Sequence, residues 1–247
     1  MFYAALRVLC VASLVAGASA AAFADRAALK TAVNNCLAAD AAGDCDCGSA
    51  SVDCGVAGDR PMSEWDTSLV SDMNKLFEGK EDFDADISAW NVSAVTDMTR
   101  MFSGAKHFTQ DISAWNVVNV VSMNTMFADC EAFNAPIGSW NTDGVTNIFQ
   151  MFHNARAFNQ PIGSWNTELV TNMDNVFVYA YEFNQDISSW NTARVTDMTE
   201  MFYDAHNFNH YIGSWNTSAV TRMGCLLYTS DAADDTPCVD LGGRRII

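Results

Sequence analysis

Seven tryptophans divide most of the chain into units of equal length. Each tryptophan stands 25 residues from the next, and the series is Trp65, Trp90, Trp115, Trp140, Trp165, Trp190 and Trp215. A valine follows five residues after every tryptophan, and six units add phenylalanines twelve and eighteen residues after it and an isoleucine twenty-two residues after it. The same residue types recur at the same spacing in six or seven copies, which predicts a tandem repeat of a single supersecondary unit. We assign seven repeats to residues 61–224, the last of them truncated.

Two local patterns recur within each unit and are clearest in the second. One has the helical spacing i, i+3, i+4 and i+7 in its apolar residues, which are Met98, Met101, Phe102 and Ala105. Thr96 precedes them and is a suitable N-cap, so this pattern predicts a short helix. The other pattern, residues 111–116, contains the isoleucine and the tryptophan and predicts a brief strand or an extended turn. A single unit cannot bury its large apolar groups, so we expect stacked copies with the tryptophans forming a structural ladder.

The repeat pattern W-N-x-x-x-V-T-x-M-x-x-M-F-x-x-A-x-x-F-N-x-D-I-S-x extends from about Met62 to Met223. It resembles the BspA-like leucine-rich repeat family, whose 25-residue form occurs in mycoplasma surface proteins and in secreted proteins of algae and other protists. The resemblance implies an α/β repeat fold, a right-handed leucine-rich-repeat-like solenoid with one short strand and one short helix per coil. It also implies display outside the cell, often with a role in adhesion or recognition. Pro136 and Pro161 depart from the pattern by replacing the aspartate.

The first twenty residues have the features of a secretion signal. A weakly basic start containing Arg7 is followed by a short apolar run and by small residues. Two A-x-A patterns predict cleavage after Ala20 or after Ala24. The alternative is an amphipathic anchor helix. On the signal interpretation, the mature protein is secreted or held at the cell surface.

Residues 25–60 precede the repeats and predict a helical, cysteine-rich N-terminal cap. The spacing of Leu29, Val33, Cys36 and Leu37 is helical, and a stack of repeats needs a cover over its first apolar layer. A separate functional mini-domain is the alternative.

Four cysteines in this region and one in the repeats stay with the mature chain. The four close together in sequence are Cys36, Cys45, Cys47 and Cys54. In an exported chain they predict two disulfides, with three possible connectivities. Zinc is the rival reading, although Cys-x-Cys without a matched second pair fits zinc-site spacing poorly. Cys130 stands where other repeats have alanine, which predicts a buried free thiol.

The last 23 residues do not continue the repeat. Residues 225–247 read CLLYTSDAADDTPCVDLGGRRII, which resembles a translated sequencing-library adapter. We therefore exclude this segment from fold reasoning, as a non-native tail.

Two sets of polar residues are candidates for binding or modification. Asp86 and Asp111 occupy equivalent positions in adjacent repeats and could share Ca²⁺, although capping of turns is the simpler role. Asn91 and Asn216 begin N-x-S sequons and are glycosylation candidates in a eukaryotic source.

Charge and motifs restrict the functional class. With 30 acidic against 13 basic residues the formal net charge is −17, which argues against nucleic acid and against anionic membrane surfaces. No apolar run reaches the roughly 18–20 residues of a membrane span, so we expect no membrane insertion after signal removal. The sequence lacks G-x-S-x-G, H-E-x-x-H and glycine-rich phosphate motifs, and we expect neither catalysis nor a cofactor. The sequence therefore favours a noncatalytic scaffold that recognises an extracellular protein or glycan, with a structural component of an extracellular matrix or cell wall as the alternative.

Overall fold

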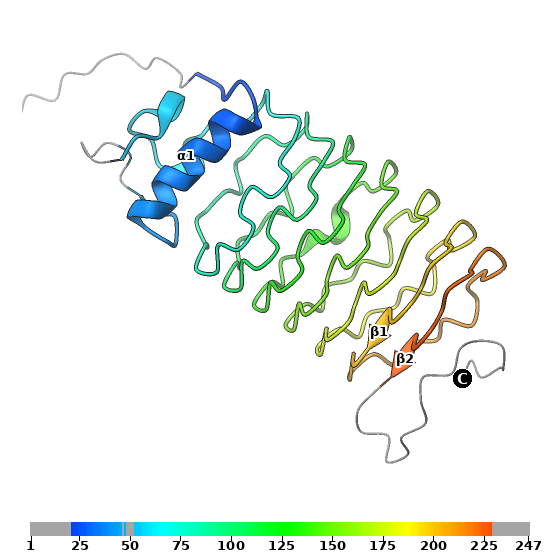
Figure 1. Cartoon of the computed structure of the whole chain (residues 1–247). Coiled ribbons are helices and arrows are strands. Elements are labelled where there is room, and N and C mark those ends of the chain that lie inside the picture. Colours follow the sequence, from blue (N-terminus) through cyan, green and yellow to red (C-terminus); the bar gives the residue numbers. More distant parts are fainter. Residues whose placement is uncertain (1–20, 46, 48–51, 229–247) are drawn as a thin grey trace, which may run out of the picture.

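The computed structural model describes residues 21–45, 47 and 52–228, in which the chain winds into coils stacked side by side (Figure 1). Regular secondary structure is sparse in this part. The elements are the α-helix α1 (Arg26–Ala39), the 3-10 helices η1 (Gly55–Ala57), η2 (Met62–Glu64) and η3 (Ile137–Ser139), and the strands β1 (Phe202–Tyr203) and β2 (Leu227–Tyr228). The predicted signal and residues 229–247 of the predicted tail lie outside the described residues.

Successive coils are stacked in the register of the sequence repeat. Isolated parallel bridges join residues 25 positions apart, in the series Asp72, Asp97, Ser122, Asn147, Asn172, Asp197 and Arg222. At the C-terminal end of this series, β1 and β2 pair in parallel over two residues, with Phe202 opposite Leu227. Residues 225–228 therefore continue the stack, although the sequence predicts that they lie outside the fold with the rest of the tail. Equivalent residues of neighbouring repeats therefore lie next to each other. The right hand of the winding stays a prediction.

The helix predicted in each unit does not form in the described repeats. Every second N–H in this segment donates to the next coil: Met98 to Ser122 O (3.0 Å), Arg100 to Asn124 O (2.9 Å), Phe102 to Met126 O (3.0 Å) and Gly104 to Ala128 O (2.8 Å). The intervening residues close tight turns, as where Met101 N donates to Met98 O at 3.1 Å. Arg100 and Gly104 have φ of 55° and 77°, which an α-helix does not contain. The prediction of one short helix per coil was wrong because these amides bind the neighbouring coil instead of their own.

Thr96 and the segment around the tryptophan were also only partly predicted. Thr96 caps no helix; its hydroxyl donates to the carbonyl of Ser71 in the preceding coil at 3.2 Å. Residues 111–116 form an extended turn, the second of the two readings, and carry no strand. Apart from β1 and β2, the β-type pairing in the described repeats consists of isolated bridges at the residue two positions after the valine, such as Asp97. The prediction of one short strand per coil was therefore wrong for the described repeats, in which the strands are β1 and β2.

The interior consists of columns of identical side chains. The phenylalanines pair within a coil and stack between coils, as in Phe102–Phe108 at 4.3 Å and Phe102–Phe127 at 5.7 Å between ring centroids. Such pairs contribute roughly 0.5–1.5 kcal/mol beyond the area they bury. Cys130 is a buried free thiol, as predicted, and its Sγ donates to Phe102 O at 2.9 Å. Burial raises the pKa of this thiol well above its usual value, so it stays protonated.

The tryptophans join the coils in two ways. Their side chains are 3–8% exposed, and neighbouring indoles stack, as Trp140 and Trp165 do at 6.4 Å. Each repeat tryptophan after the first also donates from Nε1 to a carbonyl 28 residues earlier, as Trp140 does to Ile112 O at 3.2 Å. The same bond occurs at Trp90, Trp115, Trp165, Trp190 and Trp215. The ladder thus adds a directional bond to apolar burial at every coil.

Helix α1 covers the first coil at the N-terminal end of the stack (Figure 1). Asp25 caps the helix by accepting from Ala28 N at 2.9 Å, a stabilising arrangement at a helix start. The buried face of α1 is Leu29, Ala32, Val33, Cys36 and Leu37. Phe23, 1% exposed, packs against Trp65 with 5.4 Å between ring centroids and begins the aromatic column.

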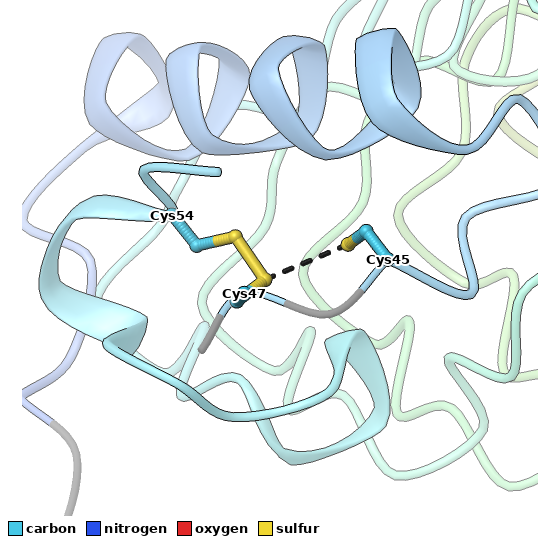
Figure 2. A group of neighbouring side chains, drawn as sticks. All are labelled: Cys45, Cys47 and Cys54. Carbon is cyan, nitrogen blue, oxygen red and sulfur yellow. Dashed lines mark hydrogen bonds between the residues drawn. A yellow bond between two sulfur atoms is a disulfide. The ribbon is translucent and has the colours of Figure 1, made fainter. Parts of the chain in front are cut away.

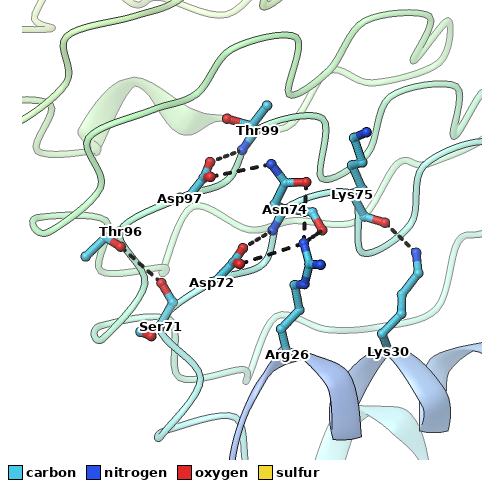
Figure 3. A network of polar contacts seen from close by, with 9 residues as sticks. All are labelled: Arg26, Lys30, Ser71, Asp72, Asn74, Lys75, Thr96, Asp97 and Thr99. Atoms are coloured by element: carbon cyan, nitrogen blue, oxygen red, sulfur yellow. Dashed lines mark hydrogen bonds and ion pairs between the residues drawn. The ribbon is translucent and has the colours of Figure 1, made fainter.

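The helix also supplies hydrogen-bond donors to the first coil. In later coils the carbonyls of Thr99 and Met101 accept N–H groups from the preceding coil, but their equivalents in the first coil, Asn74 and Leu76, have no preceding coil. Arg26 Nη1 donates to Asn74 O at 3.1 Å, and Lys30 Nζ donates to Lys75 O (Figure 3). Lys30 Nζ also donates to Leu76 O. Two cationic side chains therefore substitute for the missing backbone donors.

We expect Trp140→Ala to lower the free energy of unfolding by about 3–5 kcal/mol, because it opens a cavity between stacked coils and removes an inter-coil bond. Trp215→Ala should cost less, since no repeat tryptophan follows it in the sequence. Chemical denaturation of both variants checks this. If both variants lost the same free energy of unfolding, the stability of a coil could not depend on contacts with the coils on both of its sides.

The contacts of Phe23 also distinguish the two predicted cleavage sites. Cleavage after Ala24 would remove Phe23, together with the bond from its N–H to Asp66 O at 2.9 Å. We therefore expect N-terminal sequencing of the exported protein to begin at Ala21. Phe23→Ala should lower the free energy of unfolding by roughly 3–5 kcal/mol, the usual range for a buried phenylalanine. An exported protein that begins at Asp25 would contradict this assignment.

Candidate functional site

The cysteines of the N-terminal region form two disulfides that lie beside each other. Cys36 pairs with Cys45 and Cys47 with Cys54, with Cα–Cα distances of 5.3 and 5.7 Å. The sulfurs of Cys45 and Cys47 are 3.5 Å apart, and with Cys54 they form a group close enough for a metal (Figure 2). Zinc binds thiolates, and sulfurs already joined in disulfides cannot supply them. The structure thus selects one of the three connectivities: Cys36–Cys45 ties the chain after α1 to the helix, and Cys47–Cys54 closes a loop within that chain.

The two calcium candidates are engaged in turns. Asp86 Oδ1 accepts from Ser88 N at 2.9 Å and from Ser88 Oγ at 2.6 Å, and Asp111 Oδ1 accepts from Ser113 N at 2.9 Å. The bonds from the serine side chain and then its backbone hold the pKa of each carboxyl below the usual value. In the part of the chain that the structure describes, neither aspartate belongs to a group of three or more metal-ligating side chains. Both act as turn caps here.

Repeats without this aspartate also lack the serine. Pro136 and Pro161 are each followed by glycine two residues later, at Gly138 and Gly163. A Cβ at either glycine would collide with a carbonyl oxygen of the next coil, so the close approach of backbones excludes a side chain. These residues and Asp186 line a shallow hollow of about 520 Å³. Its shape follows from the contact between coils.

Both sequon asparagines are exposed and lie directly after a ladder tryptophan. Asn91 Oδ1 accepts from Ser93 N at 3.1 Å and from Ser93 Oγ at 2.7 Å, and Asn216 Oδ1 accepts from Ser218 N at 3.0 Å. Asn116 makes the same turn with Val118, where there is no sequon. The local geometry is therefore a property of the repeat, and both sites stay glycosylation candidates on accessible surface.

Aromatic side chains gather on one surface of the fourth to sixth coils. We call this set the tyrosine cluster, and its members are His153, Tyr179, Tyr181, Tyr203 and His206. Tyr179 lies at its centre, with ring centroids 5.9 Å from His153, 6.3 Å from Tyr181 and 5.7 Å from Tyr203, all in edge-to-face contact. All five side chains keep contact with solvent. A partly exposed aromatic set of this kind is typical of recognition surfaces.

Tyr181 joins three coils within this cluster. The guanidinium of Arg156 lies 5.7 Å from its ring centroid, and His206 stacks on it at 5.1 Å. Arg156 is itself held by Glu131 at 3.3 Å and by Asn154 Oδ1 at 2.9 Å. These contacts connect equivalent positions of successive coils, so Tyr181 has a clear structural role.

Tyr179 has no such explanation in the repeat. Every described coil from the first to the sixth has a left-handed residue fourteen positions after its tryptophan, and the column is Gly79, Gly104, Asp129, Asn154, Tyr179 and Asp204. Glycine, asparagine and aspartate tolerate this conformation, whereas a bulky aromatic residue is an outlier there. Tyr179 has a φ of 57° and carries a strain of order 1 kcal/mol or more. Left-handed residues other than glycine also recur ten positions after the tryptophan, among them Lys75, Thr125 and Glu200, so the φ of Tyr179 is not exceptional in this repeat. What distinguishes Tyr179 is an aromatic ring at the centre of a partly exposed aromatic set.

The tyrosine cluster could not be predicted from the residues that the repeats share. The signal was present as departures from the columns: Tyr179 among Gly, Asp and Asn, and Tyr181 among charged residues. The stacking of coils was also needed to show that Tyr179, Tyr181 and Tyr203 meet, since Tyr203 belongs to the next repeat.

The serine bonds to the turn aspartates give a pH-dependent prediction. A depressed pKa means that each bond stabilises the fold above the unfolded value of 3.8, and the contribution is lost as the pH falls through the lower folded pKa. In an NMR titration, Ser88→Ala should raise the pKa of Asp86 while leaving that of Asp111 unchanged. An unaltered Asp86 titration would contradict the dominant role of the Ser88 hydroxyl.

Comparison with known proteins is informative at the level of the family. No curated protein matches the chain. Among the described residues, no helix is both long enough and apolar enough to cross a membrane. A family model described as "Mycoplasma protein of unknown function, DUF285" matches residues 48–162 and again residues 134–237. The two matches span most of the 247 residues, including the repeats and the tyrosine cluster. The chain therefore belongs to the DUF285 family of mycoplasma-type repeat proteins.

Proposed function

We propose that this protein is a secreted or cell-surface, noncatalytic repeat scaffold that recognises an extracellular protein or glycan through the tyrosine cluster. The observation that carries the proposal is Tyr179, an aromatic residue at a position that other coils fill with glycine, aspartate or asparagine. The two disulfides and the match to a mycoplasma repeat family support a place outside the cell. We also propose that the repeats are of the BspA-like leucine-rich type, wound with a right hand.

A structural role in a matrix or cell wall is the competing proposal. The uniform columns that join coil to coil support it, because a stiff stack of coils is what a structural component needs. Such a role requires no exposed aromatic set. Saturable binding to immobilised glycans or cells, displaced by soluble competitor, would favour recognition. Detergent-resistant retention in the wall fraction without such binding would favour the structural role.

Tyr179→Asn provides a sharp test because asparagine is the residue that the preceding coil uses at this position. We expect the variant to be at least as stable as the parent, by up to about 1 kcal/mol, since the left-handed strain is relieved. We also expect saturable binding to cells or immobilised ligand to fall at least tenfold. Chemical denaturation and a binding isotherm measure the two effects on the same sample.

Tyr211→Ala is the matched control, because Tyr211 is 70% exposed and lies outside the cluster. It should leave both binding and stability unchanged. Loss of more than about 2 kcal/mol in Tyr179→Asn with binding intact would show that the ring is structural.

A further inference from the structure

We propose that the tyrosine cluster binds a lysine- or arginine-bearing segment of a partner protein. This inference rests on the recognition role proposed above and narrows it to one class of partner. Three features support it: the ring of Tyr181 already holds a cation, the surrounding coils are strongly acidic, and tyrosine is among the residues that dominate protein interfaces.

The first feature is the contact between Arg156 and Tyr181. The guanidinium lies 5.7 Å from the ring centroid, within the range in which a cation is attracted by an aromatic face. Glu131 fixes the same guanidinium at 3.3 Å, so a carboxylate and an aromatic ring together hold the cation. Tyr179 and Tyr203 meet edge to face at 5.7 Å beside this pair. They extend the same kind of surface.

The second feature is the charge of the fifth and sixth coils, which carry all members of the cluster except His153; the fourth coil, which carries His153, adds one acidic and one basic residue, Asp143 and Arg156. Residues 165–214 contain one arginine and no lysine, and their acidic residues are Glu168, Asp174, Glu182, Asp186, Asp197, Glu200 and Asp204. Burial raises the pKa of Asp174, and the negative charges of Asp197 and Glu200 raise it further. Arg222 acts in the opposite direction and forms an ion pair with Asp197 at 3.2 Å. A basic partner segment would be attracted to this surface, and an acidic segment would be repelled by it.

The charge of these coils also favours a basic protein segment over glycans, which are the other common ligands of aromatic surfaces. An anionic glycan would be repelled by the seven carboxylates, and a neutral glycan would gain nothing from them. A cationic side chain uses both the rings and the carboxylates. The observations therefore favour a basic protein segment over a glycan.

The test uses the full chain and a pair of peptides. One peptide carries four arginines separated by glycine and serine, and its counterpart has glutamine at the four positions. We expect the arginine peptide to bind and the glutamine peptide not to bind, with affinity that falls as salt is raised. The double variant Tyr179→Asn, Tyr203→Ser leaves the net charge unchanged and uses residues that other coils have at these positions. It should raise the Kd of the arginine peptide by about two- to fivefold for each ring removed.

Tyr211→Ala, which also leaves the charge unchanged, should not alter the Kd. Equal affinity for the two peptides, or an arginine-peptide affinity that the double variant leaves intact, would overturn the proposal. If the double variant loses saturable binding to cells while peptide binding is unaffected, the recognition role stands and the basic partner falls. Loss of binding to a neutral β-glucan oligosaccharide in the same variant would likewise point to a glycan.

Discussion

The amide groups that cross from one coil to the next are the interaction on which the rest of this structure depends. Alternate N–H groups such as those of Met98, Arg100 and Phe102 donate forward to carbonyls 24 residues later. This arrangement satisfies buried backbone groups without helices or long strands. It also fixes the register at one repeat, so identical side chains are superimposed. The aromatic columns are a consequence of that register and stabilise it in return.

Because these amides donate forward, the equivalent carbonyls of the first coil have no preceding coil to donate to them and need an external donor. Arg26 and Lys30 of α1 meet that need at the carbonyls of Asn74 and Leu76. The N-terminal region is thus required for hydrogen bonding as well as for burial. Burial lowers the pKa of Lys30, which shows that this donor is held against a partly desolvated edge. The disulfides Cys36–Cys45 and Cys47–Cys54 constrain the chain that follows the helix.

The repeat and its buried columns could be predicted from the sequence because identical spacing implies identical environment. The local conformation could not. Met98, Met101 and Phe102 have helical spacing, yet a series of tight turns presents the same side chains to the core. The helix and the series of turns differ in the acceptors of the backbone N–H groups. In this structure those acceptors belong to a neighbouring coil, which a local sequence pattern does not describe. The prediction for Cys130 was confirmed because it needed only the column, not the backbone path.

The candidate site could not be predicted from the periodicity of the sequence. Periodicity identifies what every coil shares, whereas a surface that binds one partner must be formed by residues that the coils do not share. Asp129, Asn154 and Asp204 show what the left-handed position needs for folding alone. Tyr179 departs from that requirement at a cost in backbone strain, and it does so where Tyr181 and Tyr203 from the same and the next coil can meet it. In a repeat protein, a residue that departs from its column is therefore a candidate for a role outside folding, and here the structure brings Tyr181 and Tyr203 to it.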